Sequence, residues 1–217
     1  MNLKLRIGLI SSMVLMAWCC CFAQNGIPKR WPVSDPVAYL TFLPNDSFAI
    51  DTPRPVTYRH RNVTAFMNDE QDSLLFQCNG TRIVNKHLQT LDNGDSLTDN
   101  KFYQLMHGVG SSITQGALAL PKKGNTYWVF YYSWTDSLLI ENDASPDRFY
   151  YALVDMDANG GAGKVVEKKV PLHKGVMGDC RLTAVRHANG RDWWMVNHAY
   201  VNNTFNKWLV TPDSVYG

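Results

Sequence analysis

Acidic and amide side chains stand at alternate positions before a glycine and could bind calcium. Asp155, Asp157 and Asn159 have the spacing of the first half of an EF-hand-like loop, whose oxygen ligands suit this cation. The acid that closes such a loop is missing, because position 166 holds valine and Glu167 comes one residue late. We therefore favour a plain turn, and calcium is the single cofactor that the sequence suggests.

Histidine side chains in the last third of the chain could form a metal site or an acid–base pair. His173, His187 and His198 have neither His-x-x-x-His nor Glu-x-x-His spacing, so we interpret them as hydrogen-bonded or surface residues near strand ends. The glycine- and serine-containing stretch 107–112 has the pattern of neither a nucleophile elbow nor a phosphate-binding loop. No catalytic residue is predicted.

Tryptophan side chains could bind sugar rings by stacking, and Trp134 and Trp193 are the candidates. Successive side chains of a strand point to opposite faces, so Trp193 and its neighbour Trp194 cannot both lie on an exposed face. At least one of these two rings is therefore expected to pack in the core. Core packing is also the alternative for Trp134.

The overall composition indicates a folded protein built mainly of strands. Of 217 residues, 45% are hydrophobic and 12% aromatic, and few stretches have a helical period. The 21 Lys and Arg residues nearly balance the 19 Asp and Glu residues, so no broad basic face for a nucleic-acid backbone is expected. Nucleic acid is therefore not an expected partner.

Residues 1–23 have the features of a secretory signal peptide. Lys4 and Arg6 precede an apolar run over 7–18, and a small-x-small sequence closes the segment at 21–23. An uncleaved membrane anchor and lipidation of one of cysteines 19–21 are the alternatives that we favour less. The sequence thus predicts an exported protein at the outer-membrane surface, outside the cell or in the periplasm, which meets the membrane only through its signal peptide or the export machinery.

Two cysteines, Cys78 and Cys180, follow this segment. An even pair in an exported chain permits one disulfide between them. Nothing in the sequence brings the two residues together, so we favour two separate buried thiols.

Residues 24–217 contain three similar hairpin patterns. In each pattern a second apolar run begins ten residues after the first, and a polar turn lies between them. The paired runs are 64–66 with 74–76, 117–119 with 127–129, and 183–185 with 193–195. Further runs typical of strands follow each hairpin, so the chain is predicted to be an all-β meander.

Repeated four-stranded antiparallel units with a period of tens of residues are typical of β-propeller blades. We expect blade-like units at about 37–111, 112–178 and 179–217, with a leading strand near 37–50 and no outer strand in the third unit. Three blades do not close a ring, so the sequence predicts an incomplete propeller and the N-terminal fragment of a longer protein. A sandwich or jelly roll is the alternative, although neither predicts a repeated hairpin.

Four phrases, in this order, carry a resemblance to a known family. They are residues 65–91 (AFMNDEQDSLLFQCNGTRIVNKHLQTL), 112–121 (SITQGALALP), 149–164 (FYYALVDMDANGGAGK) and 182–198 (LTAVRHANGRDWWMVNH). They resemble the N-terminal propeller-like region of large exported proteins from type IX secreting bacteria, which include gliding-associated cell-surface proteins. The resemblance implies a WD-repeat-like propeller with a binding or scaffold role. The chain departs from the family in the turn at 69–72, which lacks the usual Asn-Gly.

Serines in Asp-Ser-aliphatic triplets are similar to the O-glycosylation acceptors of exported proteins in the same bacterial group. The four serines are Ser73, Ser96, Ser137 and Ser214. Ordinary Asp-Ser turn chemistry is the alternative for these triplets, and it is the one that we favour.

The sequence leads to two functional hypotheses of different classes. The first is an exported, non-catalytic binding or scaffold domain whose partner is a protein or a glycan at the cell surface. The alternative is a carbohydrate-active or peptidase-associated enzyme with carboxylates gathered at the centre of the propeller. The expected inner strands 64–67, 114–120 and 182–185 contain no Asp or Glu, which favours the first hypothesis. A fragment without function, with exposed strand edges, is a third interpretation.

Overall fold

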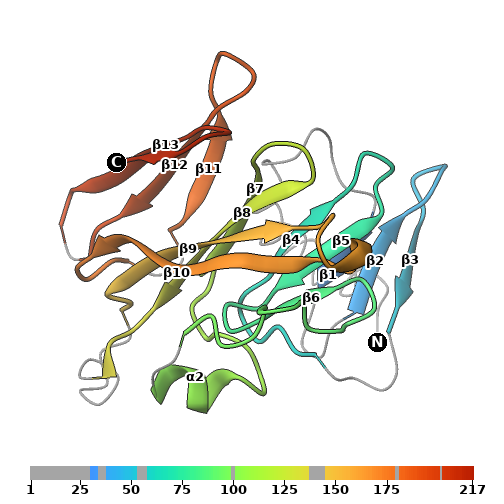
Figure 1. Cartoon of the computed structure of the whole chain (residues 1–217), viewed down its shortest axis with the longest axis horizontal. Helices are drawn as coiled ribbons and strands as arrows, with labels where there is room; N and C mark the ends of the chain where they lie inside the picture. Colours follow the sequence, from blue (N-terminus) through green and yellow to red (C-terminus); the bar gives the residue numbers. More distant parts are fainter. Residues whose placement is uncertain are drawn as a thin grey trace, which may run out of the picture.

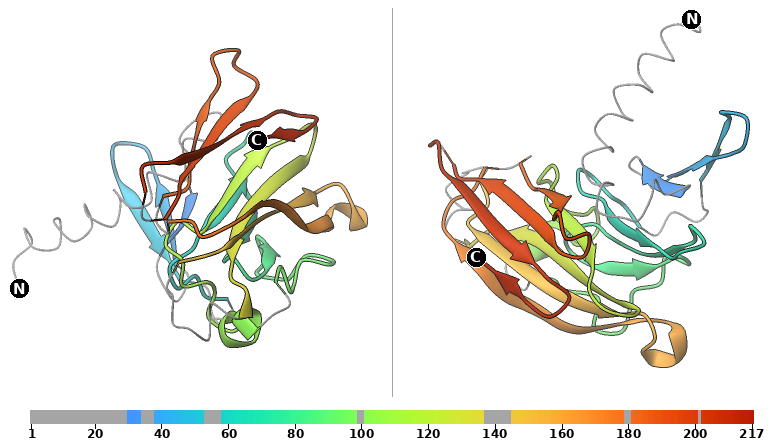
Figure 2. Two further views of the ribbon diagram at one scale, coloured as in Figure 1. Left: turned by 90° about the vertical axis from the view of Figure 1, so that its left-hand side faces the viewer. Right: turned by 90° about the horizontal axis from the view of Figure 1, so that it is seen from above.

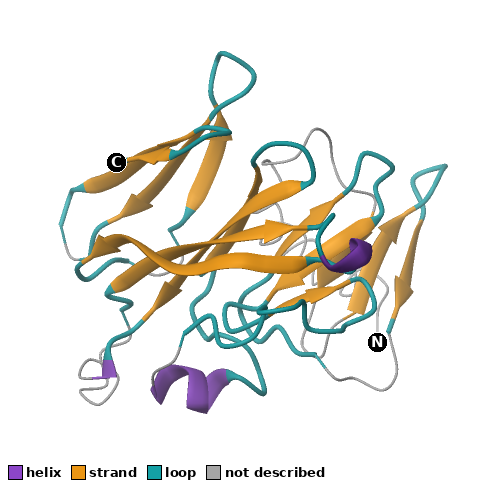
Figure 3. Cartoon of the chain, in the orientation of Figure 1, coloured by secondary structure: helices purple, strands orange, loops and turns teal. Residues whose placement is uncertain are grey.

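The computed structural model describes residues 30–33, 38–52, 58–98, 101–136, 145–178, 181–200 and 202–217. Within them the chain is all-β, as predicted, with four antiparallel sheets that follow one another along the chain (Figure 1). Among the residues that the structure describes, helix is confined to short segments such as α2 (Lys101–Met106) and the 3-10 turn Asn159–Gly161 (Figure 3). No helix among the described residues is long and apolar enough to span a membrane.

Each sheet is a meander, because every strand pairs with its neighbours in sequence. Sheet 1 contains β1 (Arg30–Val33), β2 (Ala38–Phe42) and β3 (Phe48–Asp51), and sheet 2 contains β4 (Ala65–Asn68), β5 (Leu74–Cys78) and β6 (Ile83–Asn85). Sheet 3 contains β7 (Ala117–Pro121), β8 (Thr126–Ser133), β9 (Arg148–Asp155) and β10 (Lys164–Lys174). Sheet 4 contains β11 (Thr183–Arg186), β12 (Trp193–His198), β13 (Phe205–Val210) and β14 (Val215–Tyr216).

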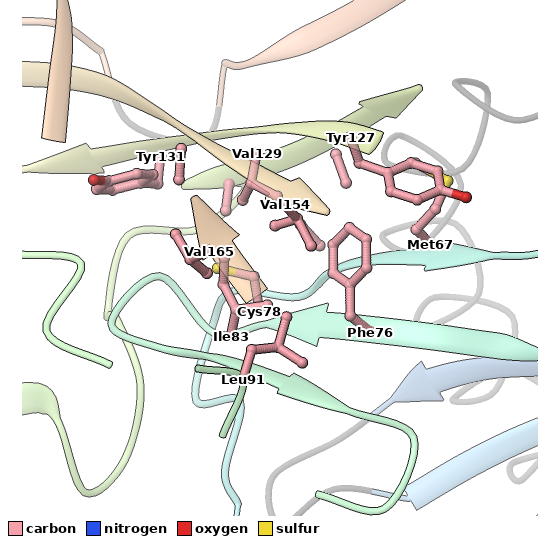
Figure 4. Packing of buried hydrophobic residues seen from close by; sticks show 14 of the residues in the cluster. Met67, Phe76, Cys78, Ile83, Leu91, Tyr127, Val129, Tyr131, Val154 and Val165 are labelled. Atoms are coloured by element: carbon pink, nitrogen blue, oxygen red, sulfur yellow. The ribbon is translucent and has the colours of Figure 1, made fainter. Parts of the chain in front are cut away.

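Sheet 3 is covered on both faces, which explains the almost continuous apolar sequence of β8. Alternate side chains of its strands, such as Trp128 and Phe130, pack against sheet 4. The intervening side chains, such as Val129 and Tyr131, pack against sheet 2 in the core shown in Figure 4. A strand buried on both faces has no polar side to give it the alternating pattern of a half-buried strand.

Sheet 1 packs against sheet 2 through a smaller core of Trp31, Tyr39, Phe66 and Leu74. The sheets therefore stack in sequence order, and sheets 1 and 4 lie at opposite ends of the molecule (Figures 1 and 2). The four described sheets form neither a closed barrel nor a closed propeller.

Two details of the predicted units are wrong. The segment near 37–50 is not one leading strand but the two paired strands β2 and β3, so the first unit spans two sheets. The third unit does have an outer strand, because β14 pairs with β13 through Leu209 with Tyr216 and Val210 with Val215. The strand β14 could not be predicted from the sequence, because its two residues are too few to show the alternation of a strand.

The three predicted hairpins exist as β4–β5, β7–β8 and β11–β12, but their registers differ. Pro121 pairs with Tyr127, six positions on, whereas Arg186 pairs with Trp193, seven positions on. A shift of one residue moves every side chain of a strand to the other face. Thr183, which occupies the sequence position of the buried Ala117, is therefore exposed.

Candidate binding face

The two sides of sheet 4 differ in what they contact. Ala184, Trp193, Met195 and Val210 point toward sheet 3 and belong to the core. On the opposite side, a row of side chains crosses all four strands, because the register pairs Val185 with Trp194, Trp194 with Leu209, and Leu209 with Tyr216. This side is open, as the 60% exposure of Val185 shows.

Two further rows lie on the same side, where Val196 pairs with Lys207 and His198 pairs with Phe205. Phe205 is 64% exposed, although apolar side chains of this size are ordinarily buried. We call this surface the outward face. It consists of Thr183, Val185, Trp194, Val196, His198, Phe205, Lys207, Leu209 and Tyr216, none of which is acidic.

Cationic and imidazole groups surround the aromatic rings of the outward face. The Lys207 Nζ lies 4.7 Å from the centre of the Trp194 ring, and the centre of the His187 ring lies 5.5 Å from the same point. At the other end of the strands, Arg181 Nη1 donates a hydrogen bond of 2.6 Å to His198 Nδ1. The outward face thus combines apolar area with positive charge.

The acid nearest in sequence to Trp194 is Asp192, and it has partners of its own. Its carboxylate accepts hydrogen bonds from Arg191 Nε at 2.7 Å and from Asn189 Nδ2 at 2.7 Å. These two donors, chiefly Arg191, hold the pKa of Asp192 below its ordinary value. Because Asp192 is paired within the β11–β12 turn, we do not expect it to neutralise the outward face.

The prediction that Trp134 and Trp193 stack on a ligand is wrong. Both rings are buried. The centre of the Trp134 ring lies 4.4 Å from that of the Phe102 ring, and Trp193 lies in the core between sheets 3 and 4. Trp194 is the half-buried ring of the pair, as strand alternation requires once Trp193 points inward. The adjacency of the two rings indicated that one lies inside, but only the register tells which.

The histidines do not come together as one site. His187 and His198 lie near opposite ends of the outward face, whereas His173 lies on β10 near Trp208. Burial lowers the pKa of His173 from its ordinary value, because the charged imidazolium is less well solvated there.

The calcium candidates lie at the end of β9, which Asp155 closes, and in the turn that leads to β10. Asp155 Oδ1 accepts hydrogen bonds from the backbone N–H groups of Asp157 at 2.9 Å and Ala158 at 3.2 Å, and Asp157 Oδ1 accepts one from Asn125 Nδ2 at 2.7 Å. Asn159 takes a left-handed backbone with φ of 54°. These contacts are those of an Asx turn. Among the described residues, no group of three or more His, Cys, Asp or Glu side chains is placed to hold a metal ion.

Cys78 is a free thiol, so no disulfide is formed at this residue. It lies on β5 and points into the core between sheets 2 and 3, fully buried (Figure 4). Burial raises its pKa to about 12. The other half of the suggested disulfide, Cys180, lies outside the described residues.

Three of the four candidate glycosylation serines lie in described turns. Ser73 is exposed, and its backbone N–H donates to Asp69 Oδ1 at 2.8 Å. Ser96 and Ser214 are half-buried, and Ser214 donates its N–H to Thr211 Oγ1 at 3.0 Å. Ser137 lies outside the described residues. Of the three described serines, Ser73 offers the most accessible acceptor, and its modification stays a prediction.

No protein-family model matches the chain, and no curated protein or solved structure matches it either. The resemblance to propeller-like regions of type IX secreted proteins therefore stays a prediction.

Proposed function

We propose that the chain is an exported, non-catalytic binding or scaffold domain that holds a cell-surface protein or glycan on the outward face of sheet 4. The observation that carries this proposal is the exposure of aromatic and aliphatic side chains across the four strands of one sheet, with cations among them. Large apolar side chains that gather on an open face favour an interaction site over ordinary surface.

The composition of the outward face favours recognition of a partner with an apolar centre and acidic groups around it. Aromatic side chains such as Trp194 and Tyr216 provide large contact areas at low cost in side-chain entropy. Lys207 and Arg181 supply positive charge to the rim, where it favours carboxylate or sulfate groups of the partner. Acidic side chains on the face would weaken such binding, and the face contains none.

Two further parts of the proposal rest on the sequence. Export rests on the signal-peptide features of residues 1–23, which lie outside the described residues. A blade-type architecture rests on the repeated hairpins and is supported by four consecutive meanders that stack in chain order. A cell-surface protein related to type IX secreted proteins is the setting that fits both.

Binding arrays of glycans and peptides test the proposal, with emphasis on acidic ligands. We expect ligands whose affinity falls at least about tenfold in Val185→Glu, which places a negative charge on the outward face. Val166→Glu is the matched control, because Val166 is a 50% exposed valine on β10, away from that face. Arrays without ligands, or ligands that bind both variants equally well, contradict the proposal.

A further inference from the structure

The opposite end of the molecule also exposes apolar side chains, on the β2–β3 hairpin. Phe42 pairs with Phe48 and Leu40 pairs with Ile50, so strand alternation places these four side chains on one face of the hairpin, where Leu40 is buried. Ile50 is 62% exposed, and the rings of Phe42 and Phe48 are also exposed. Trp31 pairs with Leu40 on the same face and is buried, and its ring centre lies 5.1 Å from that of Phe42. The hairpin therefore presents an apolar surface of its own.

The charge of this hairpin is opposite to that of the outward face. Residues 38–51 contain two acids, Asp46 and Asp51, and no Lys or Arg. Asp51 pairs with Tyr39 on the other face of the hairpin from Ile50, and it is paired with Arg30 at 3.0 Å. The exposed Asp46 in the turn is therefore the acid that gives this apolar surface its negative charge. The outward face contains Lys207 and no acid. Two apolar surfaces of complementary charge thus occur on one chain.

Sheets 1 and 4, which carry the two surfaces, lie at opposite ends of the stack of sheets, as Figures 1 and 2 show. They are too far apart for the hairpin to cover the outward face of its own chain. A contact between unlike surfaces of two copies is heterologous, and it leaves one surface free at each end for a further copy. Contact between two outward faces would instead bring Lys207 and Arg181 of each copy toward like charges.

We infer that the outward face binds a second copy of this chain through its β2–β3 hairpin, head to tail. This inference rests on the proposed function of the outward face as a binding surface, and it names the partner. Phe42, Phe48 and Ile50 of one copy then cover the row of Val185, Trp194 and Tyr216 of the next, and Asp46 approaches the cationic rim.

Sedimentation equilibrium over a series of concentrations tests the inference on the protein in the form that its host produces. We expect the average mass of the wild type to rise with concentration beyond that of a dimer. Val185→Glu places a negative charge on the outward face, and Ile50→Lys places a positive charge on the hairpin surface. Each variant alone is therefore expected to associate at least about tenfold more weakly than the wild type. Val166→Glu and Leu105→Lys change exposed residues away from both surfaces and should associate like the wild type.

Mixing the two variants gives the decisive outcome. Val185→Glu retains an intact hairpin and Ile50→Lys retains an intact outward face, so the mixture should form a heterodimer and nothing larger. A misfolded variant could not restore association in this way. A wild type that stays monomeric, or an Ile50→Lys variant that still dimerises, overturns the inference. Array ligands that depend on Val185 would uphold the proposed function even then.

Discussion

Single side chains in this protein are governed by the sheet that holds them. Trp193 and Trp194 are adjacent and chemically identical, yet one lies in the core and the other on the outward face. Cys78 is similarly determined by its place on β5, where its thiol points into the core. The sequence predicts that adjacent rings face opposite ways, but it does not predict which one is inside, because that depends on pairing across strands.

The thiol of Cys78 should be inert in the folded protein. Only the thiolate reacts, and burial raises the pKa of Cys78 to about 12, so the thiol stays protonated at about pH 8. We expect iodoacetamide to leave Cys78 unlabelled in the native protein and to label it after denaturation, as peptide mass spectrometry would show. Native labelling, or a peptide in which Cys78 is bonded to Cys180, would contradict this expectation.

Asp192 should make the stability of the β11–β12 turn depend on pH. Its pKa is lowered in the folded state, so its contribution is present above the unfolded pKa of about 3.9 and is lost as pH falls through the folded value. We expect Asp192→Asn to lower the urea midpoint at neutral pH. The difference from the wild type should shrink as the pH falls below the unfolded pKa of about 3.9 and through the folded value. A difference in midpoint that stays constant with pH would argue against this role of the carboxylate.

At the scale of strands and hairpins, the sequence predicts where a hairpin forms better than it predicts which residues of its two strands pair. Apolar runs separated by turns correctly locate β7–β8 and β11–β12, because alternation and turn residues are local properties. The registers depend on one extra residue between Arg186 and Trp193 and on an irregularity between Met67 and Asn68. A single residue reverses the faces of a strand, so a candidate face cannot be read from spacing alone.

Tyr131 should stabilise the irregular part of β10. Its buried hydroxyl donates to Leu97 O at 2.9 Å and accepts from Lys169 N at 2.9 Å, where the register of β10 with β9 shifts and Lys169 has a φ of 61°. Tyr131→Phe leaves both backbone groups without this partner, so we expect a loss of about 1–3 kcal/mol in the free energy of unfolding.

Urea denaturation would measure this loss, with Tyr200→Phe as the control, because Tyr200 is exposed. The exposed control should change the free energy of unfolding by less than about 0.5 kcal/mol. Equal effects of the two substitutions would show that the Tyr131 hydroxyl does not hold this bulge.

At the scale of the whole molecule, the stacking of the sheets decides which faces are open. Sheet 3 contacts a neighbour on each side, whereas sheets 1 and 4 each end the stack and expose apolar side chains. This order could not be predicted from periodicity, because it depends on contacts between residues far apart in the chain. The candidate face emerges only when register and stacking are both known.

Trp194 provides a direct test of binding at the outward face. Every other tryptophan that the structure describes is buried, so acrylamide should quench an emission component that disappears in Trp194→Phe. The difference between the wild type and this variant isolates Trp194. We predict that the tightest acidic ligand from the arrays, at saturation, reduces the quenching of this component. Unchanged quenching of Trp194 with the ligand bound would contradict the assignment of the outward face as the binding surface.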